Sequence, residues 1–378
     1  MTPLAETQLL EPITDTPSVV VLEEVEDTLS DSEDYIVDNP SHNSTSSSAP
    51  EIKGIVLSPS KAASSSSSSA NGNPKKVKRL ALISSEELRT PTIAVPTIAV
   101  AAGSLLVWGS VLYAGAHKRW VSPLLTFPLM TAACFASFTP VHDATHSSVA
   151  KGVYKKPVNN LVGYLSGLPL NLPFGVYRQL HLLHHRYTNT DKDPDVWDSR
   201  GPMVVRFIKW FFPDFFWMKS VLGGEVPNAR LGEAALYYLG VMFMMRQFHK
   251  RGMAFVKYWL IPQRAAYWLL MWLFAYVPHR ADGDHEHYSA TDNIYKMTNV
   301  TGGILRSDGL NLAIPLLNQH LHNIHHLYPQ LPFTRYGAIW RKHKDALIAA
   351  GTEIHPVYSK NQGWRWDEKL DGIRSKHS

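Results

Sequence analysis

Three histidine clusters constrain this chain more than any other feature of its sequence. They read H-x-x-x-H at residues 142–146, H-x-x-H-H at 181–185 and H-x-x-H-H at 322–326. Residues three and four apart lie on the same face of a helix, so a helical cluster presents its imidazoles together. The eight imidazoles exceed the roughly four to six positions that one metal ion offers, which favours two ions. The fold must therefore bring three helical segments, far apart in the sequence, to one place.

The single cysteine limits the kind of metal site that the chain can build. Cys134 lies within an apolar run, so the chain has neither an intrachain disulfide nor a thiolate metal site. Structural zinc sites of the finger type use thiolates and are therefore excluded. Clustered imidazoles without thiolates suit a first-row transition metal such as iron or zinc.

Long apolar runs indicate an integral membrane protein. Ile93–Gly115 and Trp120–Val141 contain no charged residue, and each exceeds the ~20 residues needed to cross the hydrocarbon of a bilayer. Phe255–Val277 and the shorter Leu231–Met245 are further candidates for crossing. We therefore predict an all-α fold, an integral membrane protein with about four transmembrane helices and a cytosolic helical cap that carries the histidines.

The order of these segments places the histidine clusters on one side of the membrane. The second apolar run ends at the first cluster, and Leu161–Phe174 is too short to cross before the second cluster. The later candidates would return the chain to the same side before the third cluster. The basic stretch Lys75–Arg79 precedes the first run and marks this side as cytosolic. Arg246, Lys250 and Arg251 would then lie on the opposite side, against the positive-inside trend, but the alternative separates the clusters across the bilayer.

Composition divides the chain into three regions. Residues 1–80 are rich in Ser, Pro and acids, with twelve acids and no Lys or Arg in residues 1–52, and we expect them to be disordered. Residues 90–350 form the predicted membrane domain, and residues 351–378 form a charged C-terminal tail. All 37 Lys and Arg residues follow residue 52, which favours anionic lipid head groups over nucleic acid as a partner. Because the chain begins with neither a signal peptide nor a transit peptide, we expect the endoplasmic reticulum membrane, with the N-terminus and the histidines cytosolic.

The series H-D-x-x-H, H-x-x-H-H and H-x-x-H-H resembles that of the membrane fatty acid desaturase and hydroxylase superfamily. The resemblance covers roughly residues 90–350 and implies a non-haem di-iron centre, two iron ions that use O2 as co-substrate. It also implies a hydrophobic lipid substrate and a separate electron donor of the cytochrome b5 or ferredoxin type. His279 matches an isolated histidine that completes the iron ligands in relatives. The full set of implied ligands is His142, His146, His181, His184, His185, His279, His322, His325 and His326.

Residues beside the histidine clusters resemble one branch of this superfamily in more detail. Residues 276–280 and 322–336 are similar to the cyanobacterial-type β-carotene ring hydroxylases, and His320 stands where an Asn is expected in that branch. His320 is therefore a further candidate, as an iron ligand, a hydrogen-bond donor or a spectator. Four polar residues near the histidine clusters, which we also call histidine boxes, resemble family positions that orient the imidazoles. They are Asp143, Asn189, Asp193 and Asp195.

The resemblance implies an O2-dependent membrane oxidoreductase that acts on a long apolar lipid. Hydroxylation of a carotenoid ring of the β-carotene type is the leading hypothesis, and fatty acyl desaturation is the alternative. Both reactions begin by breaking an unactivated C–H bond, so the histidine boxes do not distinguish them. A membrane metal transporter rich in histidine is a remote alternative from another class. A transporter would place its ligands at mid-membrane, whereas these clusters lie at helix ends.

Overall fold

A computed structural model of the chain describes residues 83–247, 253–280, 291, 293–302 and 312–357. All of them belong to one compact unit, Leu82–Ser378. The predicted disorder of residues 1–80 and the tail beyond residue 357 lie outside the described residues, so both stay predictions. The described chain is mostly helical, in agreement with the expected fold class.

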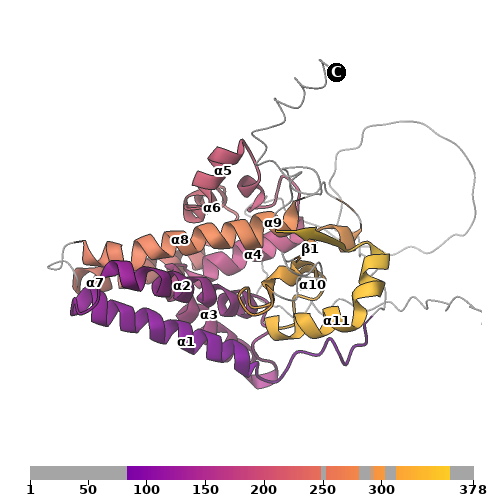
Figure 1. Ribbon diagram of the computed structural model, residues 1–378, viewed down its shortest axis with the longest axis horizontal. Coiled ribbons are helices and arrows are strands. Elements are labelled where there is room, and N and C mark those ends of the chain that lie inside the picture. The colour runs from indigo at the N-terminus through magenta and orange to yellow at the C-terminus, as the bar shows by residue number, and fades with distance from the viewer. Residues whose placement is uncertain (1–82, 248–252, 281–290, 292, 303–311, 358–378) are drawn as a thin grey trace, which may run out of the picture. The chain divides into compact units, whose positions relative to one another are not determined.

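Two long apolar helices form one end of the unit (Figure 1). Helix α1, Val95–Val111, continues through a π-helical turn at Leu112–His117, and α2 spans Pro123–Thr145. Ser122 caps α2 by accepting a hydrogen bond from the backbone N–H of Leu124, and the proline in its first turn is compatible with a helix start. The outer faces of these helices are apolar and exposed, as helices that contact lipid would be.

Among the described helices, two are long and apolar enough to cross a membrane, Val95–His117 and Pro123–Thr145. The other two expected crossings are not confirmed. Leu231–Met245 lies within α7, Asn228–Gln247, which also carries Arg230 and Glu233. Phe255–Val277 is helical but alternates between α and π turns: a π turn at Val256–Leu260, α8 at Ile261–Leu270, a π turn at Met271–Tyr276 and α9 at Val277–His279.

Leu161–Phe174 comprises the C-terminal part of one helix, a short turn and the first residue of the next helix. Helix α3, Lys155–Leu170, ends at Asn171, whose φ of 52° is the left-handed conformation that often closes a helix. Helix α4 then runs from Phe174 to Tyr187. Gly163 packs so closely on the Phe174 ring that an added Cβ would lie 2.4 Å from it. This turn brings the second histidine cluster back against α2.

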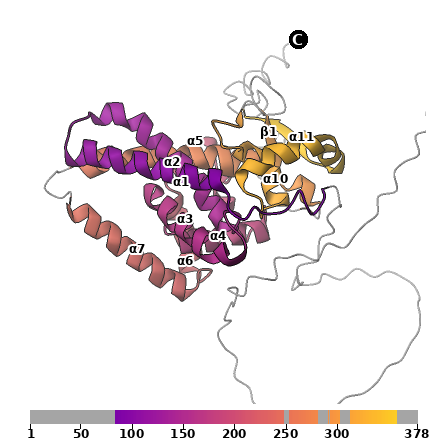
Figure 2. The ribbon, with the colours of Figure 1, turned by 90° about the horizontal axis from the view of Figure 1, so that it is seen from below.

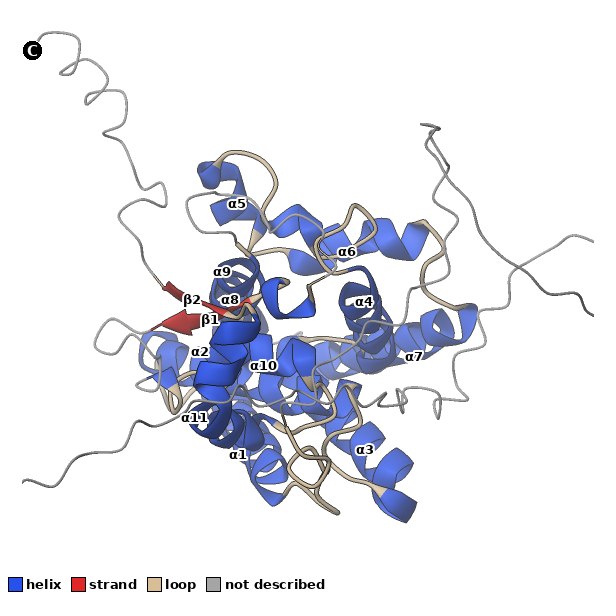
Figure 3. Ribbon diagram, turned by 90° about the vertical axis from the view of Figure 1, so that its right-hand side faces the viewer, coloured by secondary structure: helices blue, strands red, loops and turns tan. Residues whose placement is uncertain are grey.

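Some of the remaining elements form a cap beyond the ends of the long helices, and others lie alongside α8, as Figures 1 and 2 show. Strand β1, Asn299–Gly302, pairs in parallel with β2, Glu353–Pro356, next to α9 (Figure 3). This small sheet was not expected from the sequence, and β2 lies in the region assigned to the tail. The helices among these elements are α5 (Met203–Lys209), α6 (Pro213–Leu222), α10 (His322–Leu327) and α11 (Phe333–Ala350), with short 3₁₀ turns at Gly152–Tyr154, Val196–Asp198, Ile294–Lys296 and Gln319–Leu321.

Helix α8 fastens the C-terminal end of α3 by hydrogen bonds from its side chains. The carbonyl oxygens at a helix end have no partner within the helix. Here the Leu170 carbonyl accepts from Gln263 Nε2 at 2.6 Å and from the Tyr267 hydroxyl at 2.9 Å. The neighbouring Pro169 carbonyl accepts from Trp259 Nε1 at 2.7 Å. These buried bonds fix α8 opposite α4, with the apolar core between the helices.

Candidate metal centre

The structure brings the nine predicted histidines together from four helical segments. The last turn of α2 carries His142, and His146 follows at its C-terminal cap. Four of the rings form a first histidine group, His142, His146, His181 and His325, and four form a second histidine group, His184, His279, His322 and His326. Within each group the candidate donor atoms all lie within 4.8 Å of one another.

His185 lies between the two groups. Its Nε2 is 2.8 Å from Nε2 of His325, which belongs to the first group. Its ring stacks on that of His326, in the second group, with the centroids 4.2 Å apart. These three imidazoles form a third set of possible donors, so the two groups adjoin.

The spacing of the ring nitrogens fits metal ions. Two nitrogens bound cis to one ion at about 2.1 Å lie about 3.0 Å apart. The Nε2 atoms of His279 and His322 are 3.0 Å apart, and so are those of His322 and His326. In the first group, His142 Nδ1 and His146 Nε2 are buried without a hydrogen-bond partner among the described residues. Such unpaired buried nitrogens are costly unless something binds them.

Burial keeps most of these imidazoles neutral, which is the form that binds metal. It lowers the pKa of His181, His322 and His325 well below the ordinary value of 6.5 because the charged ring is poorly solvated. Neutral rings offer a lone pair to a metal ion at physiological pH. His184 differs. Burial disfavours its charged form, but the carboxylates of Asp193 and Asp195 outweigh burial and raise the pKa of His184 to about 9.

A loop after α4 orients the second group. His184 Nδ1 lies 2.9 Å from Asp193 Oδ1, so it donates to this carboxylate and leaves Nε2 toward the neighbouring rings. Asn189 Oδ1 lies 3.2 Å from His279 Nδ1, and Asn189 Nδ2 donates to the Met297 carbonyl at 2.7 Å. Asn189 adopts a φ of 63°, and its backbone N–H donates to Asp193 at 3.0 Å. Two predicted polar positions thus contact imidazoles directly.

Aromatic residues orient the first group. The Tyr336 hydroxyl lies 3.1 Å from His325 Nδ1. The His142 ring stacks on Phe138 and the His181 ring on Tyr177, at centroid distances of 5.5 and 5.4 Å. The sequence analysis did not select these aromatic residues as site residues. Tyr336 lies eleven positions after His325 and on another helix, so no helical spacing links the two.

The other predicted positions are placed differently. Asp143 is expected to orient an imidazole, but its carboxylate accepts from Thr97 Oγ1 at 2.8 Å and from the Phe333 backbone N–H at 3.2 Å. It therefore ties α2 to α1 and to the start of α11. Asp195 accepts from Trp217 Nε1 at 2.6 Å, and its other oxygen is 3.9 Å from His184 Nδ1. His320 is buried but belongs to none of the possible metal-binding groups among the described residues.

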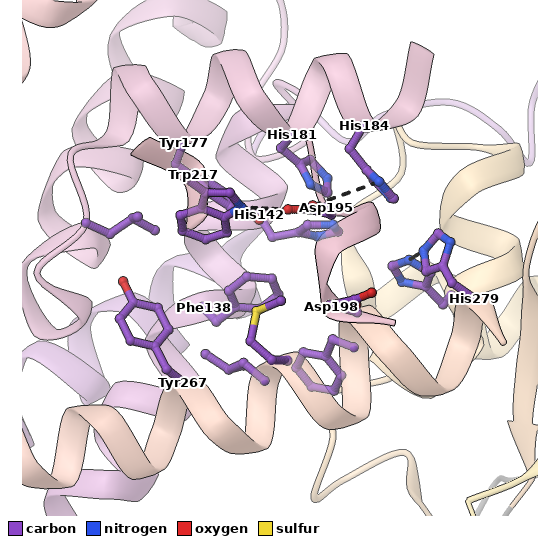
Figure 4. A pocket seen from close by; sticks show the side chains of 16 residues that line it. Phe138, His142, Tyr177, His181, His184, Asp195, Asp198, Trp217, Tyr267 and His279 are labelled. Carbon is purple, nitrogen blue, oxygen red and sulfur yellow. Dashed lines mark hydrogen bonds and ion pairs between the residues drawn. The ribbon is translucent and has the colours of Figure 1, made fainter. Parts of the chain in front are cut away.

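An apolar pocket reaches both histidine groups. Figure 4 shows imidazoles of both groups at one end and Tyr267 at the other. Phe138, Trp217 and Phe274 contribute to its walls, and the turns of α8 and the following π segment line one side. Apolar walls with a few polar groups at one end are typical of a site for an apolar molecule. The arrangement places such a molecule beside the imidazoles.

Comparison with known proteins decides the family. The fatty acid desaturase family profile matches residues 118–358, well over half of the chain. The chain belongs to the fatty acid desaturase family. As the sequence pattern predicts, this desaturase-family chain falls within the membrane desaturase and hydroxylase superfamily. Enzymes of this family are O2-dependent di-iron oxidoreductases of lipid metabolism, and the clustered imidazoles of this chain agree with a metal-dependent activity of this kind.

Individual relatives have two kinds of named activity. The desaturase-family chain is 29% identical over 162 residues to an sn-1 oleoyl-lipid 12-desaturase of Picosynechococcus, covering 37% of this chain and 46% of the relative. It is 27% identical over 264 residues to a β-carotene ketolase of Paracoccus, covering 64% of this chain and 94% of the relative. A chloroplastic omega-6 fatty acid desaturase of Arabidopsis thaliana is 24% identical over 247 residues, covering 58% and 53%. The chain spans about half the length of the lipid desaturases that it matches.

Proposed function

We propose that the chain holds two iron ions, one in each histidine group, and uses O2 to hydroxylate a carotenoid ring of the β-carotene type. The observation that carries the proposal is the apolar pocket that ends on both histidine groups. When bound, the iron supplies the O2 chemistry that breaks an unactivated C–H bond, which no side chain can do. The donor set fits this role, because most of the imidazoles are neutral and all of them are closely spaced.

The chain's own residues position the reactants. Asp193 and Asn189 hold His184 and His279, and Tyr336 holds His325, so the donors are arranged before any ion binds. The aromatic wall of the pocket excludes water and holds the substrate against the imidazoles. In such a dry pocket a small shift of the substrate changes which C–H bond lies next to the metal site. We therefore expect the pocket wall, and not the histidines, to set the position of attack.

The relatives favour a carotenoid as the substrate. The β-carotene ketolase of Paracoccus is matched over 94% of its length, against 46% for the 12-desaturase of Picosynechococcus. Converting a ring CH2 group to a carbonyl requires oxygen to be inserted at a C–H bond, which is the reaction proposed here. The proposed hydroxylation consumes the C–H bond, one O2, two electrons and two protons, and gives an alcohol and one water molecule.

Fatty acyl desaturation is the second candidate, since lipid desaturases are among the relatives. It needs the same first hydrogen abstraction, after which a second hydrogen leaves the neighbouring carbon and the product contains no new oxygen. The family assignment supports either reaction over a metal transporter. Because the end of α2 and the helices α9 and α10, which carry histidines, lie toward the cap (Figure 1), we further propose four crossings of the endoplasmic reticulum membrane, with the cap and N-terminus cytosolic.

The product of the reaction tests the proposal. The chain is expressed in a host that makes β-carotene and in the same host without carotenoid synthesis, and both lipid extracts are analysed by mass spectrometry. We expect carotenoids that have gained oxygen atoms in the first host and unchanged acyl chains in both. His325→Ala, produced to the same level, is the matched control and should give no product. Acyl chains that have lost two hydrogens would support desaturation instead, and an iron-loaded, membrane-inserted protein that changes neither lipid would refute both.

A further inference from the structure

One residue of the pocket wall contacts neighbours of both histidine groups. Trp217 lies on α6, is buried and lines the pocket together with side chains of α4 and α8. Figure 4 shows its ring beside Tyr177, with Asp195 between it and His184. This position makes Trp217 a candidate for placing the substrate, an inference that rests on the proposed function.

The first contact leads to the second histidine group through a carboxylate. Trp217 Nε1 donates to Asp195 Oδ1 at 2.6 Å, and Asp195 Oδ2 lies 3.9 Å from His184 Nδ1. The Asp195 backbone N–H donates at 2.9 Å to Asp193 Oδ1, the oxygen that contacts His184. Removing the indole N–H would take this donor from a carboxylate beside His184, and the loop would lose one of the bonds that fix it.

The second contact leads to the first histidine group through neighbouring rings. The centroids of the Trp217 and Tyr177 rings are 6.0 Å apart, and those of the Tyr177 and His181 rings are 5.4 Å apart. Tyr177 and His181 are one helical turn apart on α4, so they share a face of the helix. Because buried rings are closely packed, a displaced indole has to move Tyr177 or leave a gap beside it. Trp217 therefore adjoins the two groups by separate routes.

An ion pair holds the helix of Trp217 against α8, which lines another side of the pocket. Arg264 of α8 donates to the two carboxylate oxygens of Asp214, from Nη1 at 2.7 Å and from Nη2 at 2.8 Å. Arg264 Nη1 also donates to the Phe211 carbonyl at 3.2 Å. Such a two-point pair fixes orientation as well as distance. Asp214 precedes Trp217 by three residues on α6, so the wall is held in place before substrate enters.

We propose that Trp217 is a positioning residue of the reaction and that its bond to Asp195 couples the pocket to the second histidine group. A flat apolar molecule in the pocket packs on the aromatic ring, so the ring decides which C–H bond lies beside the imidazoles. The indole N–H meets Asp195 only while the ring keeps its orientation. Substrate that fixes the ring thereby fixes Asp195, and with it the loop that holds His184.

The position of attack tests the role of the ring. Wild type and Trp217→Leu are expressed in the host that makes β-carotene, and NMR of the products identifies the carbon that gains oxygen. We expect Trp217→Leu to lower the ratio of the main positional product to all others about tenfold, because the substrate is no longer held against a flat wall.

Trp259→Phe is the matched control for the loss of an indole. Trp259 is buried, and its Nε1 donates to the Pro169 carbonyl at 2.7 Å. It lies outside the lining of the pocket in the described part of the chain. Trp259→Phe should therefore change the ratio of positional products less than about twofold.

The spectrum of the iron tests the coupling without turnover. The full chain, loaded with the Mössbauer isotope of iron and reduced in the absence of O2, is examined in nanodiscs with and without β-carotene. We expect β-carotene to change the signal of one of the two irons in the wild type and in Trp259→Phe. Trp217→Phe keeps an aromatic ring without the N–H, Asp195→Ala removes the acceptor, and both should abolish the change. The double variant should lose no more than either alone, since both remove the same bond.

Each result of the variants supports or overturns the inference. A folded Trp217→Leu protein that gives the wild-type positional products overturns the role of the ring. If that variant does not fold, Trp217→Phe gives the same readout with an expected shift of about threefold. The coupling is overturned if β-carotene changes neither iron signal in the wild type, or changes the same signal equally in Trp217→Phe.

The wild-type protein alone shows whether the proposed function holds. A wild type that holds no iron, or that changes no lipid, refutes the proposed function and with it the role of Trp217. If the wild type desaturates acyl chains, the acyl lipid replaces β-carotene in both experiments, and the position of the new double bond gives the same comparison. A wild type that oxygenates carotenoids, with variants that match it, keeps the proposed function and overturns the inference.

Discussion

The two histidine groups are held in different ways. In the second group, His184 and His279 bind polar side chains from a single loop, Asn189–Asp195. In the first group, His142 and His181 stack on aromatic rings of their own helices, and His325 contacts Tyr336 on α11. The second group therefore depends on the conformation of one loop. The first group depends on the packing of whole helices.

Two buried carboxylates also differ in whether they contact a metal-site imidazole or join helices. Asp193 contacts an imidazole directly, with Oδ1 2.9 Å from His184 Nδ1. Asp143 neighbours His142 in the sequence, yet it binds Thr97 and the Phe333 backbone. Similar placement beside a histidine box thus gives one carboxylate that orients a metal donor and one that joins three helices. Their removal should affect metal affinity in the first case and stability in the second.

The largest effect should come from losing a histidine that belongs to two of the possible metal-binding sets. His325 belongs to the first group and also to the set with His185 and His326, whereas His184 belongs to the second group alone among the histidine sets. We expect His325→Ala to hold less than one iron per chain and His184→Ala to retain about one, with turnover abolished in both and membrane insertion unchanged. Iron analysis of the purified proteins checks this. Full activity in either variant would refute the ligand assignment.

Asp193→Ala should loosen the second group while sparing the first. Without the carboxylate, His184 loses the partner that fixes its Nδ1–H, and loss of such partners typically lowers metal affinity about 10- to 100-fold. Chelator competition should show one weakened iron and one unchanged. Asp191→Ala is the control, because its side chain is exposed and pairs with Arg200. Equal weakening of both irons would show that the loop does not act on the second group alone.

Asp143→Ala should reduce stability more than metal affinity. It leaves the Thr97 hydroxyl and the Phe333 N–H buried without their acceptor, at about 1 to 3 kcal/mol for each unpaired group. We expect the melting temperature of the variant in detergent to be several degrees below that of the wild type. The iron content of the folded fraction should be unchanged. Thr97→Val, which removes one donor and leaves the carboxylate, should lower it less. Loss of iron without loss of stability would assign Asp143 to the metal site after all.

Local spacing in the sequence was sufficient to predict the eight candidate ligands of the three clusters, whereas His279 was predicted from the family resemblance. Residues three and four apart share a helical face whatever the rest of the fold does, and His322, His325 and His326 do lie on the short helix α10. The contacts that hold the rings could not be predicted in this way. Tyr336 reaches His325 only because α10 and α11 pack at a particular angle, and no pattern in the sequence encodes that angle.

The fold was predicted less completely than the site. Uncharged runs identified α1 and α2, because a stretch of about 20 apolar residues is informative by itself. The strands β1 and β2 lie about 50 residues apart in the sequence and pair over four residues each, which is too short for an alternating pattern to be recognised. The segment before His279 contains two π turns, which no sequence pattern indicates.

The smallest effect should come from Glu87, the partly exposed counterpart of Asp143. Glu87 also joins the N-terminal part of the unit to α11, through Lys342 at 2.7 Å and His343 at 3.2 Å, but it does so at the surface. Hydrogen bonds from Lys342 and His343 lower the pKa of Glu87 from 4.5 to about 2. Because the pKa is lower in the folded state, the pair stabilises the fold above about pH 4.5, and this contribution is lost as the pH falls toward 2.

Glu87→Gln should therefore lower the melting temperature slightly at pH 7 and not at all near pH 2. High salt should reduce the difference, since exposed ion pairs are screened. Glu86→Gln is the control, because Glu86 is exposed and has no ion pair among the described residues. A pH-independent difference, or one as large as that of Asp143→Ala, would mean that Glu87 is more than a surface contact. The contrast between the buried and the partly exposed carboxylate that contact α11 would then have to be abandoned.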